Sequence, residues 1–226
     1  MLPLPDERPE PLTDRLTIFQ KRRGYRFGAE AVALARFAGE HPGERGADLG
    51  TGSGVVALLM SESARFAHMT GLELQPAYAD MARRSVEANR LTERITIVQG
   101  DLRRIDEYLP AGEFDFVTGN PPFYPVGTGR ASPDEARRTA MTECAATLAD
   151  FVRAAAFLLA PGGRLYLVHL PARRADVETA LGAAGLAPRR LQSVLPRRGA
   201  AASFLLFEAM RGGGPCRTEP EIILNS

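Results

Sequence analysis

Tryptophan is absent from this sequence of 226 residues, and cysteine, histidine and lysine are scarce, with two, three and one residue respectively. The two cysteines, Cys144 and Cys216, stand far apart, so they form no disulfide framework or metal-binding motif, which suits a reducing cytosol. No apolar run approaches the roughly 20 residues of a membrane-spanning helix. The acidic, proline-rich N-terminus lacks the basic and apolar regions of a secretory signal. We therefore expect a cytoplasmic protein that is neither exported nor inserted into a membrane.

What the sequence does contain is the composition of a soluble globular fold, with 45% hydrophobic and 24% charged residues. These proportions exclude disorder, collagen-like repeats and coiled coil as descriptions of the whole chain. The net charge of +1 argues against strong nonspecific binding to nucleic acid. All but one of the 28 basic residues are arginine, a bias that high-GC coding explains and that leaves open where the arginines lie. Several stand in pairs: Arg22–Arg23, Arg103–Arg104, Arg137–Arg138 and Arg197–Arg198.

Strand-like and helix-like segments alternate along the chain. Apolar stretches of strand length recur at 46–49, 68–74, 95–98, 114–118 and 164–170. Helical patterns lie at 29–37, 55–62, 76–89, 148–159 and 175–183. This alternation predicts an α/β fold with a mostly parallel sheet and helices on both faces. The last two apolar segments, 191–195 and 203–210, are joined by a link too short for a crossover, so the final strand is predicted to be antiparallel. We expect residues 1–15 to form a flexible, proline-rich arm and residues 16–226 to form a single domain.

A glycine-rich loop follows the first of these strands and opens a helix. It reads Asp48-Leu49-Gly50-Thr51-Gly52-Ser53-Gly54. Glycines at alternate positions allow a tight turn and let a ligand approach the backbone, where the helix N–H groups face it. The dinucleotide fingerprint has a different spacing, G-x-G-x-x-G. The spacing G-x-G-x-G, with an acid two residues earlier, is the usual pattern of enzymes that use S-adenosylmethionine (SAM).

Two further carboxylates follow the next two strands. Glu73 ends the second strand about 20 residues after the glycines, where a carboxylate can accept hydrogen bonds from both ribose hydroxyls. Asp101 follows the third strand and is suited to an adenine amino group. We include the neighbouring Leu74 and Leu102 in the predicted cofactor site. Each acid taken alone is equally consistent with a helix cap or a solvated loop.

The fourth strand runs into Asn120-Pro121-Pro122-Phe123, which suits an acceptor amine. Asn120 offers a side-chain carbonyl oxygen, and Pro122 fixes the direction of the Pro121 carbonyl, so two acceptors are held for the two N–H bonds of one NH2 group. Phe123 offers a flat face for a planar base. Hydrogen bonds that favour a pyramidal nitrogen would free its lone pair for attack on a methyl group, so positioning rather than a strong base supplies the rate. We predict that these four residues are catalytic and that Asn120 also contacts the cofactor.

With these motifs in place, the chain resembles the class I SAM-dependent methyltransferases that carry an Asn-Pro-Pro-[Phe/Tyr/Trp] motif. Within them it is similar to the bacterial tRNA adenine-N6 methyltransferases that act on adenosine 37 of valine tRNA. The resemblance covers nearly the whole chain, from Leu16 to Ile223. Its most specific parts are Gly-Tyr-Arg-Phe-Gly-Ala-Glu at 24–30 and Pro-Glu-Ile-Ile at 220–223. One departure is the Ala-Met-Thr-Glu at 140–143, where these relatives carry a basic signature resembling Ala-Arg-His-Glu.

The resemblance implies a seven-stranded, Rossmann-like sheet with a C-terminal antiparallel strand, and a cytoplasmic enzyme that converts SAM to S-adenosylhomocysteine without a metal. Tyr25 and Phe27 would line the methionine end of SAM. A tRNA substrate would then be the partner, bound by a monomer or weak dimer that needs no other protein. The basic residues expected to hold its phosphates are Lys21, Arg22, Arg23, Arg26, Arg130, Arg137 and Arg138.

Other functions remain open at this stage. Release-factor glutamine methyltransferases use the same Asn-Pro-Pro motif, because a side-chain amide presents a similar NH2 group, but they carry a larger domain before the first core strand. DNA adenine methyltransferases carry a large target-recognition region, and none is visible here. A noncatalytic SAM-binding module is disfavoured by the intact motif, and a nicotinamide-dependent oxidoreductase is disfavoured by the glycine spacing. Fold analogy alone does not separate these classes, whereas the acceptor-site residues do.

Overall fold

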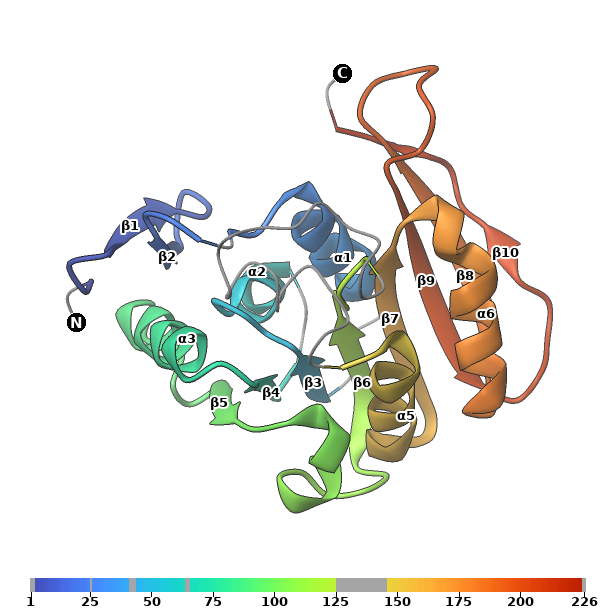
Figure 1. Ribbon diagram of the computed structural model, residues 1–226, viewed down its shortest axis with the longest axis horizontal. Coiled ribbons are helices and arrows are strands. Elements are labelled where there is room, and N and C mark those ends of the chain that lie inside the picture. The colour runs from blue at the N-terminus through green and yellow to red at the C-terminus, as the bar shows by residue number, and fades with distance from the viewer. Residues whose placement is uncertain (1–2, 25, 41–43, 64–65, 125–145, 225–226) are drawn as a thin grey trace.

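The computed structural model describes residues 3–24, 26–40, 44–63, 66–124 and 146–224 (Figure 1). Its centre is a twisted sheet in which seven strands follow the order β5-β4-β3-β6-β7-β9-β8. These strands are β3 (Arg45–Leu49), β4 (His68–Glu73), β5 (Ile95–Gln99), β6 (Phe114–Gly119), β7 (Leu159–His169), β8 (Leu186–Leu195) and β9 (Phe204–Arg211). Strands β3 to β7 are parallel, and β9 runs antiparallel to both β7 and β8. The predicted α/β class and the antiparallel final strand are therefore confirmed.

Helices cover both faces of this sheet and enclose two hydrophobic clusters. The helices are α1 (Ala29–Gly39), α2 (Val55–Ser63), α3 (Pro76–Ala88), α5 (Leu148–Leu158), α6 (Arg174–Ala183) and the 3-10 turns η1 (Leu102–Glu107) and η2 (Pro171–Arg173). The start of α5 shows how sequence sets these bounds: Thr147 accepts from the Asp150 N–H, and the Asp150 side chain accepts from the Thr147 N–H. This reciprocal cap satisfies two N–H groups that have no partner inside the helix. In the part of the chain that the structure describes, no helix is long and apolar enough to span a membrane.

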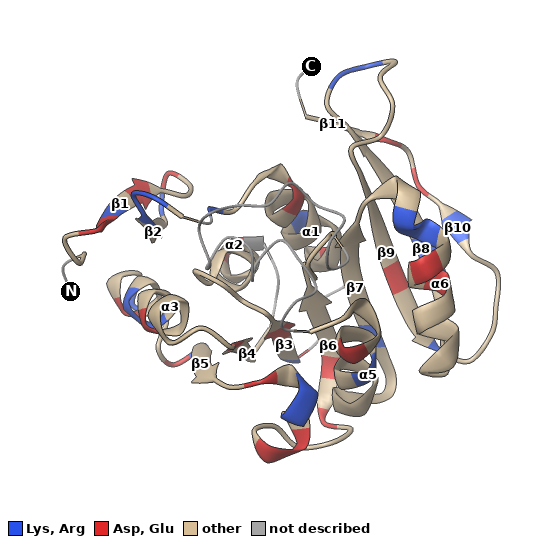
Figure 2. Ribbon diagram, viewed as in Figure 1, with Lys and Arg blue, Asp and Glu red and all other residues tan. Residues whose placement is uncertain are grey.

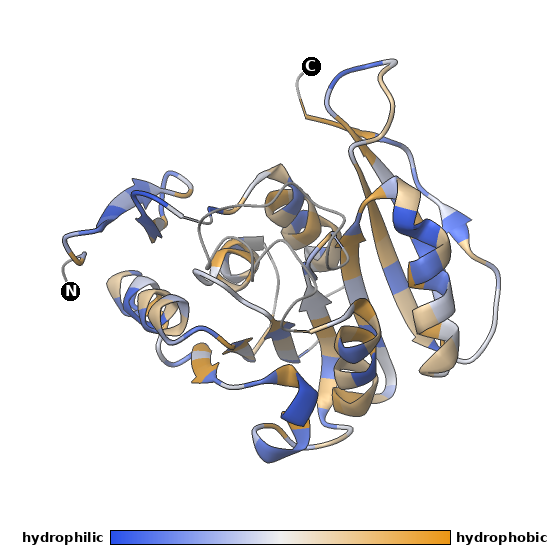
Figure 3. Cartoon of the chain, in the orientation of Figure 1, coloured by the Kyte–Doolittle hydropathy of each residue, from blue (hydrophilic) through white to orange (hydrophobic). Residues whose placement is uncertain are grey.

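The expected flexible N-terminal arm is wrong over residues 7–11. These residues form β1 (Glu7–Pro11), which pairs antiparallel with β2 (Thr17–Lys21). The resulting hairpin lies against α3 (Figure 1), and its mostly hydrophilic colour in Figure 3 explains why composition alone indicated an arm. Its anchor is an ion pair buried between distant segments: Arg84 of α3 donates to both carboxylate oxygens of Glu7, at 2.7 and 2.8 Å. An ion pair formed across 77 residues leaves no local signal in the sequence.

Two short C-terminal strands extend the sheet beyond the predicted seven. Strand β10 (Arg217–Thr218) and strand β11 (Ile222–Ile223) both pair parallel with β8. Strand β8 begins at Leu186, five residues before the predicted apolar segment, because its first half, Leu-Ala-Pro-Arg-Arg, contains a proline and two arginines and so shows neither an apolar run nor an alternation.

The parallel strands end at one edge of the sheet, and the motifs follow those ends. A single row of paired residues crosses the sheet there, formed by Leu49, Gly119, Leu167, Phe207 and Leu191. The glycine loop follows Leu49, and the Asn-Pro-Pro-Phe segment follows Gly119. Ligands of open α/β sheets bind outside this carboxyl edge, so the fold brings the predicted motifs together where a site is expected.

Candidate active site

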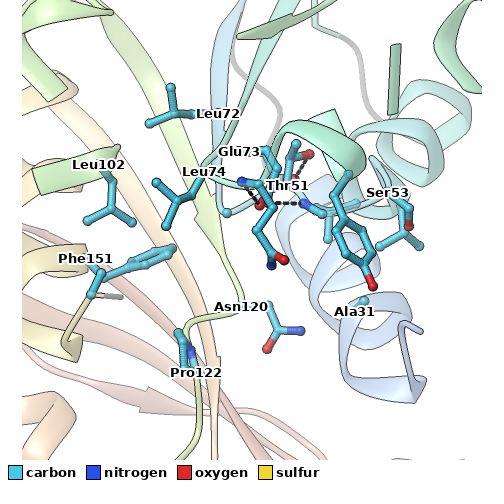
Figure 4. A pocket seen from close by; sticks show the side chains of 18 of the residues that line it. Ala31, Thr51, Ser53, Leu72, Glu73, Leu74, Leu102, Asn120, Pro122 and Phe151 are labelled. Atoms are coloured by element: carbon cyan, nitrogen blue, oxygen red, sulfur yellow. Dashed lines mark hydrogen bonds between the residues drawn. The ribbon is translucent and has the colours of Figure 1, made fainter. Parts of the chain in front are cut away.

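A cavity opens at the carboxyl edge of β3, β4 and β6, and most of the predicted cofactor residues line it. The predicted residues on its wall are Phe27, Asp48, Gly50, Thr51, Gly52, Glu73, Leu74, Asp101, Leu102, Asn120 and Pro122. Figure 4 shows Glu73, Thr51 and Asn120 around one space, with Leu74, Leu102 and Phe151 forming an apolar side. Three motifs separated by up to 70 residues of sequence are thus assembled in one cavity.

The glycine loop takes the backbone conformation that its composition predicts. Gly50, Gly52 and Gly54 have φ angles of +66°, +57° and +86°, which residues with a Cβ rarely adopt. A Cβ placed on Gly52 would meet no atom within 4 Å, so this Cα faces open space in the cavity. Gly54 is not among the lining residues, and a Cβ there would lie 3.4 Å from Ala82 of α3. The first two glycines therefore shape the cavity, whereas the third is favoured by its positive φ, because a Cβ there would make only an ordinary contact with Ala82.

Asp48 is almost fully buried behind the glycine loop, at 2% exposure. Its two carboxylate oxygens accept hydrogen bonds from the hydroxyls of Thr51, at 2.6 Å, and Thr118, at 2.7 Å. Burial raises the pKa of Asp48 to about 6, against the two hydrogen bonds, which lower it, and the Glu73 charge adds to the rise. Asp48 thus fixes the strand-to-loop turn through neutral donors, with no ion pair to any described residue.

Glu73 joins the glycine loop to the turn that follows β4. One carboxylate oxygen accepts from the Gly52 N–H at 2.9 Å, and the other accepts from the Gln75 N–H at 2.8 Å (Figure 4). Burial at 6% exposure raises the pKa of this carboxyl, although the backbone N–H groups oppose the rise. Each oxygen keeps a second lone pair for a ligand, so a carboxylate held in this way can still accept from hydroxyl groups in the cavity.

Asp101 caps a helical turn and also lies on the cavity wall, while its predicted contact with an adenine stays a prediction. Its carboxylate accepts from the Arg103 N–H at 3.0 Å and caps η1, and it also lies on the cavity wall next to Leu102. Hydrogen bonds from the Arg103 side chain lower the pKa of Asp101, against partial desolvation. The Arg103 guanidinium lies 2.5 Å from the carboxylate, so the charge of Asp101 is already paired within the chain.

The Asn-Pro-Pro-Phe segment divides between the cavity and the interior. Asn120 and Pro122 line the cavity, whereas Pro121 and Phe123 are buried. The Phe123 ring lies 5.5 Å from the His169 ring and 5.8 Å from the Phe204 ring, measured between centroids. Phe123 is not among the cavity-lining residues, so the predicted stacking of this ring on a base stays a prediction.

A hydrogen bond from an arginine side chain also holds the Asn-Pro-Pro-Phe segment. Arg173, in the short η2 turn after β7, donates from its Nη1 to the Phe123 carbonyl at 3.2 Å. This bond, with the ring contacts of Phe123, fixes the backbone that carries Asn120 into the cavity. His169 is fully buried there, and burial lowers the pKa of its imidazole to about 4, so the ring is neutral at physiological pH.

The cavity also contains residues that sequence reasoning missed. Tyr78 reaches it from α3, and Phe151 reaches it from α5. The missed residues on the wall are Ala31, Ser53, Val55, Val56, Leu72, Gln75, Tyr78, Gly100, Ala146 and Phe151. In the sequence, a helical Phe or Tyr that lines a cavity looks the same as one that packs in the core. One indirect sign of the Phe151 position is Gly119, where a Cβ would lie 2.1 Å from the Phe151 ring. The glycine therefore leaves room for this ring beside Asn120-Pro121-Pro122-Phe123, which we call the acceptor segment.

Most of the basic residues predicted to bind RNA are either engaged within the chain or outside the described residues. Lys21 contacts Asp6 at 2.8 Å and Glu7 at 3.1 Å, and Arg26 donates to both oxygens of Glu10. The Arg22 Nε donates to the Glu7 carbonyl. Arg23 is exposed and makes no ion pair with any described residue. The predicted residues that lie outside the described ranges are Tyr25, Arg130, Arg137 and Arg138.

The described residues contain no group of three or more histidine, cysteine, aspartate or glutamate side chains placed to hold a metal ion. The lining of the cavity combines carboxylates, amide and hydroxyl side chains with an apolar wall.

A family model and a curated relative that match this chain are both methyltransferases. The family model "Methyltransferase small domain" matches residues 28–184, which include the glycine loop, Glu73 and the Asn-Pro-Pro-Phe segment. A tRNA1(Val) (adenine(37)-N6)-methyltransferase of Porphyromonas gingivalis is 31% identical over 186 residues, covering 80% of this chain and 72% of that protein.

Solved structures agree on the fold. A predicted O-methyltransferase of Agrobacterium tumefaciens superposes with a TM-score of 0.67 at 25% identity, covering 86% of each chain. TrmN of Thermus thermophilus superposes with a TM-score of 0.58 at 28% identity, covering 80% of this chain and 48% of that one.

Proposed function

We propose that this chain, which belongs to the methyltransferase small domain family, transfers the methyl group of SAM to the N6 amine of an adenosine in tRNA. The observation that carries the proposal is the convergence of Asn120 with the glycine loop and Glu73 on one cavity. The curated relatives are named for adenine 37 of a valine tRNA, and we propose the same base as the acceptor here. The enzyme then acts in the cytoplasm on a folded RNA.

The cavity fits the cofactor that the family implies. The open side of Gly52 suits the close approach of a ligand to the backbone. Glu73 would accept from the ribose hydroxyls, and Asp101 with Leu102 and Leu74 would border the adenine. When bound, SAM supplies an electrophilic methyl group on a positively charged sulfur, and the product is S-adenosylhomocysteine. The uncompensated charge of Glu73 favours a cationic ligand in this space.

The acceptor segment would position the amine that receives the methyl group. Asn120 lines the cavity and would offer its side-chain carbonyl there, and Pro122 restricts Pro121 to an extended conformation that directs the Pro121 carbonyl. Two such acceptors bind both N–H bonds of an exocyclic amine and favour a pyramidal nitrogen, whose lone pair is then available for attack. The buried, neutral His169 and the Arg173 hydrogen bond keep this segment in place. Rate enhancement then comes from orientation and electrostatics: the N–C bond forms as the S–C bond breaks, and the methylated amine afterwards releases one proton to solvent, so no general base is required in the transition state.

A direct test offers the wild-type protein labelled SAM with three acceptors in parallel: unmodified tRNA, release factor and duplex DNA. We expect label in tRNA, recovered after digestion as N6-methyladenosine. An anticodon-loop base is already unpaired and needs little energy to enter the cavity, whereas a duplex base costs a few kcal/mol to extrude. Label in release factor with none in tRNA would overturn the proposal in favour of glutamine methylation.

Asn120→Ala tests the assigned role of the acceptor segment. We expect kcat for tRNA methylation to fall about 10²–10³-fold, as when one preorganised hydrogen-bond group is removed from a transition state. The dissociation constant for SAM, measured by calorimetry, should change little. Asn120→Asp, which keeps a carbonyl-type oxygen at the same position, is the matched control and should retain more activity than Asn120→Ala. Equal loss of SAM binding and turnover in Asn120→Ala would show that Asn120 serves the cofactor instead.

A further inference from the structure

The loop between β8 and β9 carries two arginines whose charges are not neutralised within the described chain. Most guanidinium groups of this protein pair with a carboxylate or a carbonyl, as Arg190 does with Glu208 and Arg173 with Asp176. Arg197 and Arg198 are exposed and make no ion pair or side-chain hydrogen bond with any described residue. The loop, residues 196–203, contains no acidic residue at all. Figure 2 shows this loop as a basic projection beside the C-terminus.

The arginine loop projects beyond the edge of the sheet that carries the cavity. Strand β8 runs parallel to β7, because both are antiparallel to β9. Leu191 of β8 stands in the same row as Gly119, directly before the acceptor segment, and the chain continues past this row to Arg197. The turn is set by Gly199 at a φ of +75° and closed by a hydrogen bond from the Ser203 N–H to the Val194 carbonyl at 2.8 Å.

One end of the arginine loop is joined to the acceptor segment by a direct contact. Phe204, the first residue of β9, packs on the ring of Phe123, with 5.8 Å between centroids. Arg198 lies six positions before Phe204, so its Cα lies within about 20 Å of the Phe204 Cα even with a fully extended chain. The Leu224 N–H donates to the Leu195 carbonyl at the other end of the loop. One stem is therefore held against the Asn-Pro-Pro-Phe segment, and the other is held by the C-terminal segment.

We infer that Arg197 and Arg198 bind phosphates of the RNA strand that flanks the target adenosine, an inference that rests on the proposed tRNA substrate. A guanidinium matches a phosphate with two parallel hydrogen bonds, and such contacts fix the register of a nucleic acid without reading its sequence. Of the earlier candidates around β2, Lys21 and Arg26 already pair with carboxylates, so the arginine loop adds two exposed guanidinium groups to the one of Arg23.

The chain supplies its own control for this inference. Arg36 and Arg90 are likewise exposed and make no ion pair with any described residue. Arg36 lies in the last turn of α1, which leads to the start of β3, and Arg90 lies between α3 and the start of β5. Both therefore stand at the amino edge of the sheet, opposite the cavity. A general charge effect would involve all four arginines, whereas a phosphate contact beside the cavity involves the loop pair alone.

The experiment compares Arg197→Ala/Arg198→Ala with Arg36→Ala/Arg90→Ala. Binding of fluorescent, unmodified tRNA to each S-adenosylhomocysteine-saturated protein is measured over a range of salt concentrations. For the loop variant we expect the dissociation constant to rise about tenfold and the salt slope of log K to flatten by about 1.4, the value for two lost phosphate contacts. The amino-edge variant should bind like the wild type. Arg197→Lys/Arg198→Lys should keep most of the salt slope, because the charges remain.

The outcomes separate this inference from the proposed function. Wild-type methylation of tRNA combined with unchanged binding and salt slope in the loop variant would overturn the role of the arginine loop and leave the function intact. Equal weakening in both alanine variants would also overturn it, since the effect would then be one of net charge. Absence of tRNA methylation and tRNA binding by the wild type would overturn the proposed function itself. SAM affinity, measured for each variant, should stay at the wild-type value and reports that the fold is preserved.

Discussion

Glu7 in the N-terminal hairpin and Asp48 beside the glycine loop are both almost fully buried, at 1% and 2% exposure, yet their surroundings differ. Burial alone would raise the pKa of Glu7, but hydrogen bonds from Arg84, the Leu4 N–H and Lys21 outweigh it and lower the pKa to about 2. Asp48 has only hydroxyl donors, and burial raises its pKa to about 6. The difference shows that the hairpin carboxylate is part of a structural ion pair, whereas the carboxylate behind the glycine loop is held by two neutral hydroxyl donors and has no counter-charge among the described residues.

Breaking the ion pair of the hairpin should have the largest effect on stability. Arg84→Met leaves Glu7 buried with only Lys21 as a counter-charge, and we expect the free energy of unfolding to fall by about 3 kcal/mol or more. Urea denaturation at neutral pH measures this change. Arg174→Met, which removes a partly exposed pair with Glu178 on α6, is the control and should cost less than about 1 kcal/mol. Equal losses in the two variants would show that burial does not distinguish these pairs.

A change of pH should have different effects on the stability contributions of Asp48 and Glu7. Because the folded-state pKa of Asp48 lies above its unfolded value of 3.8, its contribution to stability is lost as the pH rises through about 6. The stability of Asp48→Asn relative to the wild type should therefore increase by about 2 kcal/mol between pH 4.5 and 7.5, measured by urea denaturation without ligand.

The matched variant for this pH test is Glu7→Gln. The folded-state pKa of Glu7, about 2, lies below its unfolded value of 4.5, so its stabilising contribution is present above pH 4.5 and is lost as the pH falls toward 2. The stability difference between Glu7→Gln and the wild type should then stay constant to within about 0.5 kcal/mol between pH 4.5 and 7.5. A parallel pH dependence in the two variants would contradict the opposite shifts of the two carboxylates.

The smallest effect is expected at the exposed end of the same hairpin. Glu10 accepts from Arg26, whose side chain is 40% exposed, and from Gln20 at 2.6 Å. Glu10→Gln should lower the free energy of unfolding by less than about 1 kcal/mol, because solvent screens this pair. A loss as large as that of Arg84→Met would mean that the whole hairpin, and not the buried pair alone, depends on charge.

The core of the fold was predictable because its signals are local. Apolar runs such as 114–118 and 95–98 lie within β6 and β5, and the short link after residue 195 correctly indicated an antiparallel partner. The hairpin of β1 and β2 was not predictable, since the contact between Glu7 and Arg84 joins segments 77 residues apart. An acidic, proline-rich stretch that is held by one buried ion pair has the composition of an arm.

The cavity was predictable to the extent that its residues follow strand ends. Asp48, Glu73 and Asn120 stand directly at the carboxyl edge, so strand order alone brings them together. Tyr78 and Phe151 come from helices, where position on the wall depends on packing that the sequence does not display. The sequence also does not show which basic side chains form ion pairs. Lys21 and Arg197 look alike in the sequence, and only the tertiary structure shows that Lys21 pairs with a carboxylate.

The pairing of β10 and β11 with β8 also bears on how this protein behaves in a crowded solution. A strand at the border of a sheet offers unpaired N–H and C=O groups to which a strand of another molecule can add, which is a common route to aggregation. In this chain the C-terminal segment occupies that border at Arg190–Leu191 and again at Val194–Leu195. The pairing of β10 and β11 thus covers part of this border of the sheet against strand addition by another copy, next to the loop that carries Arg197 and Arg198.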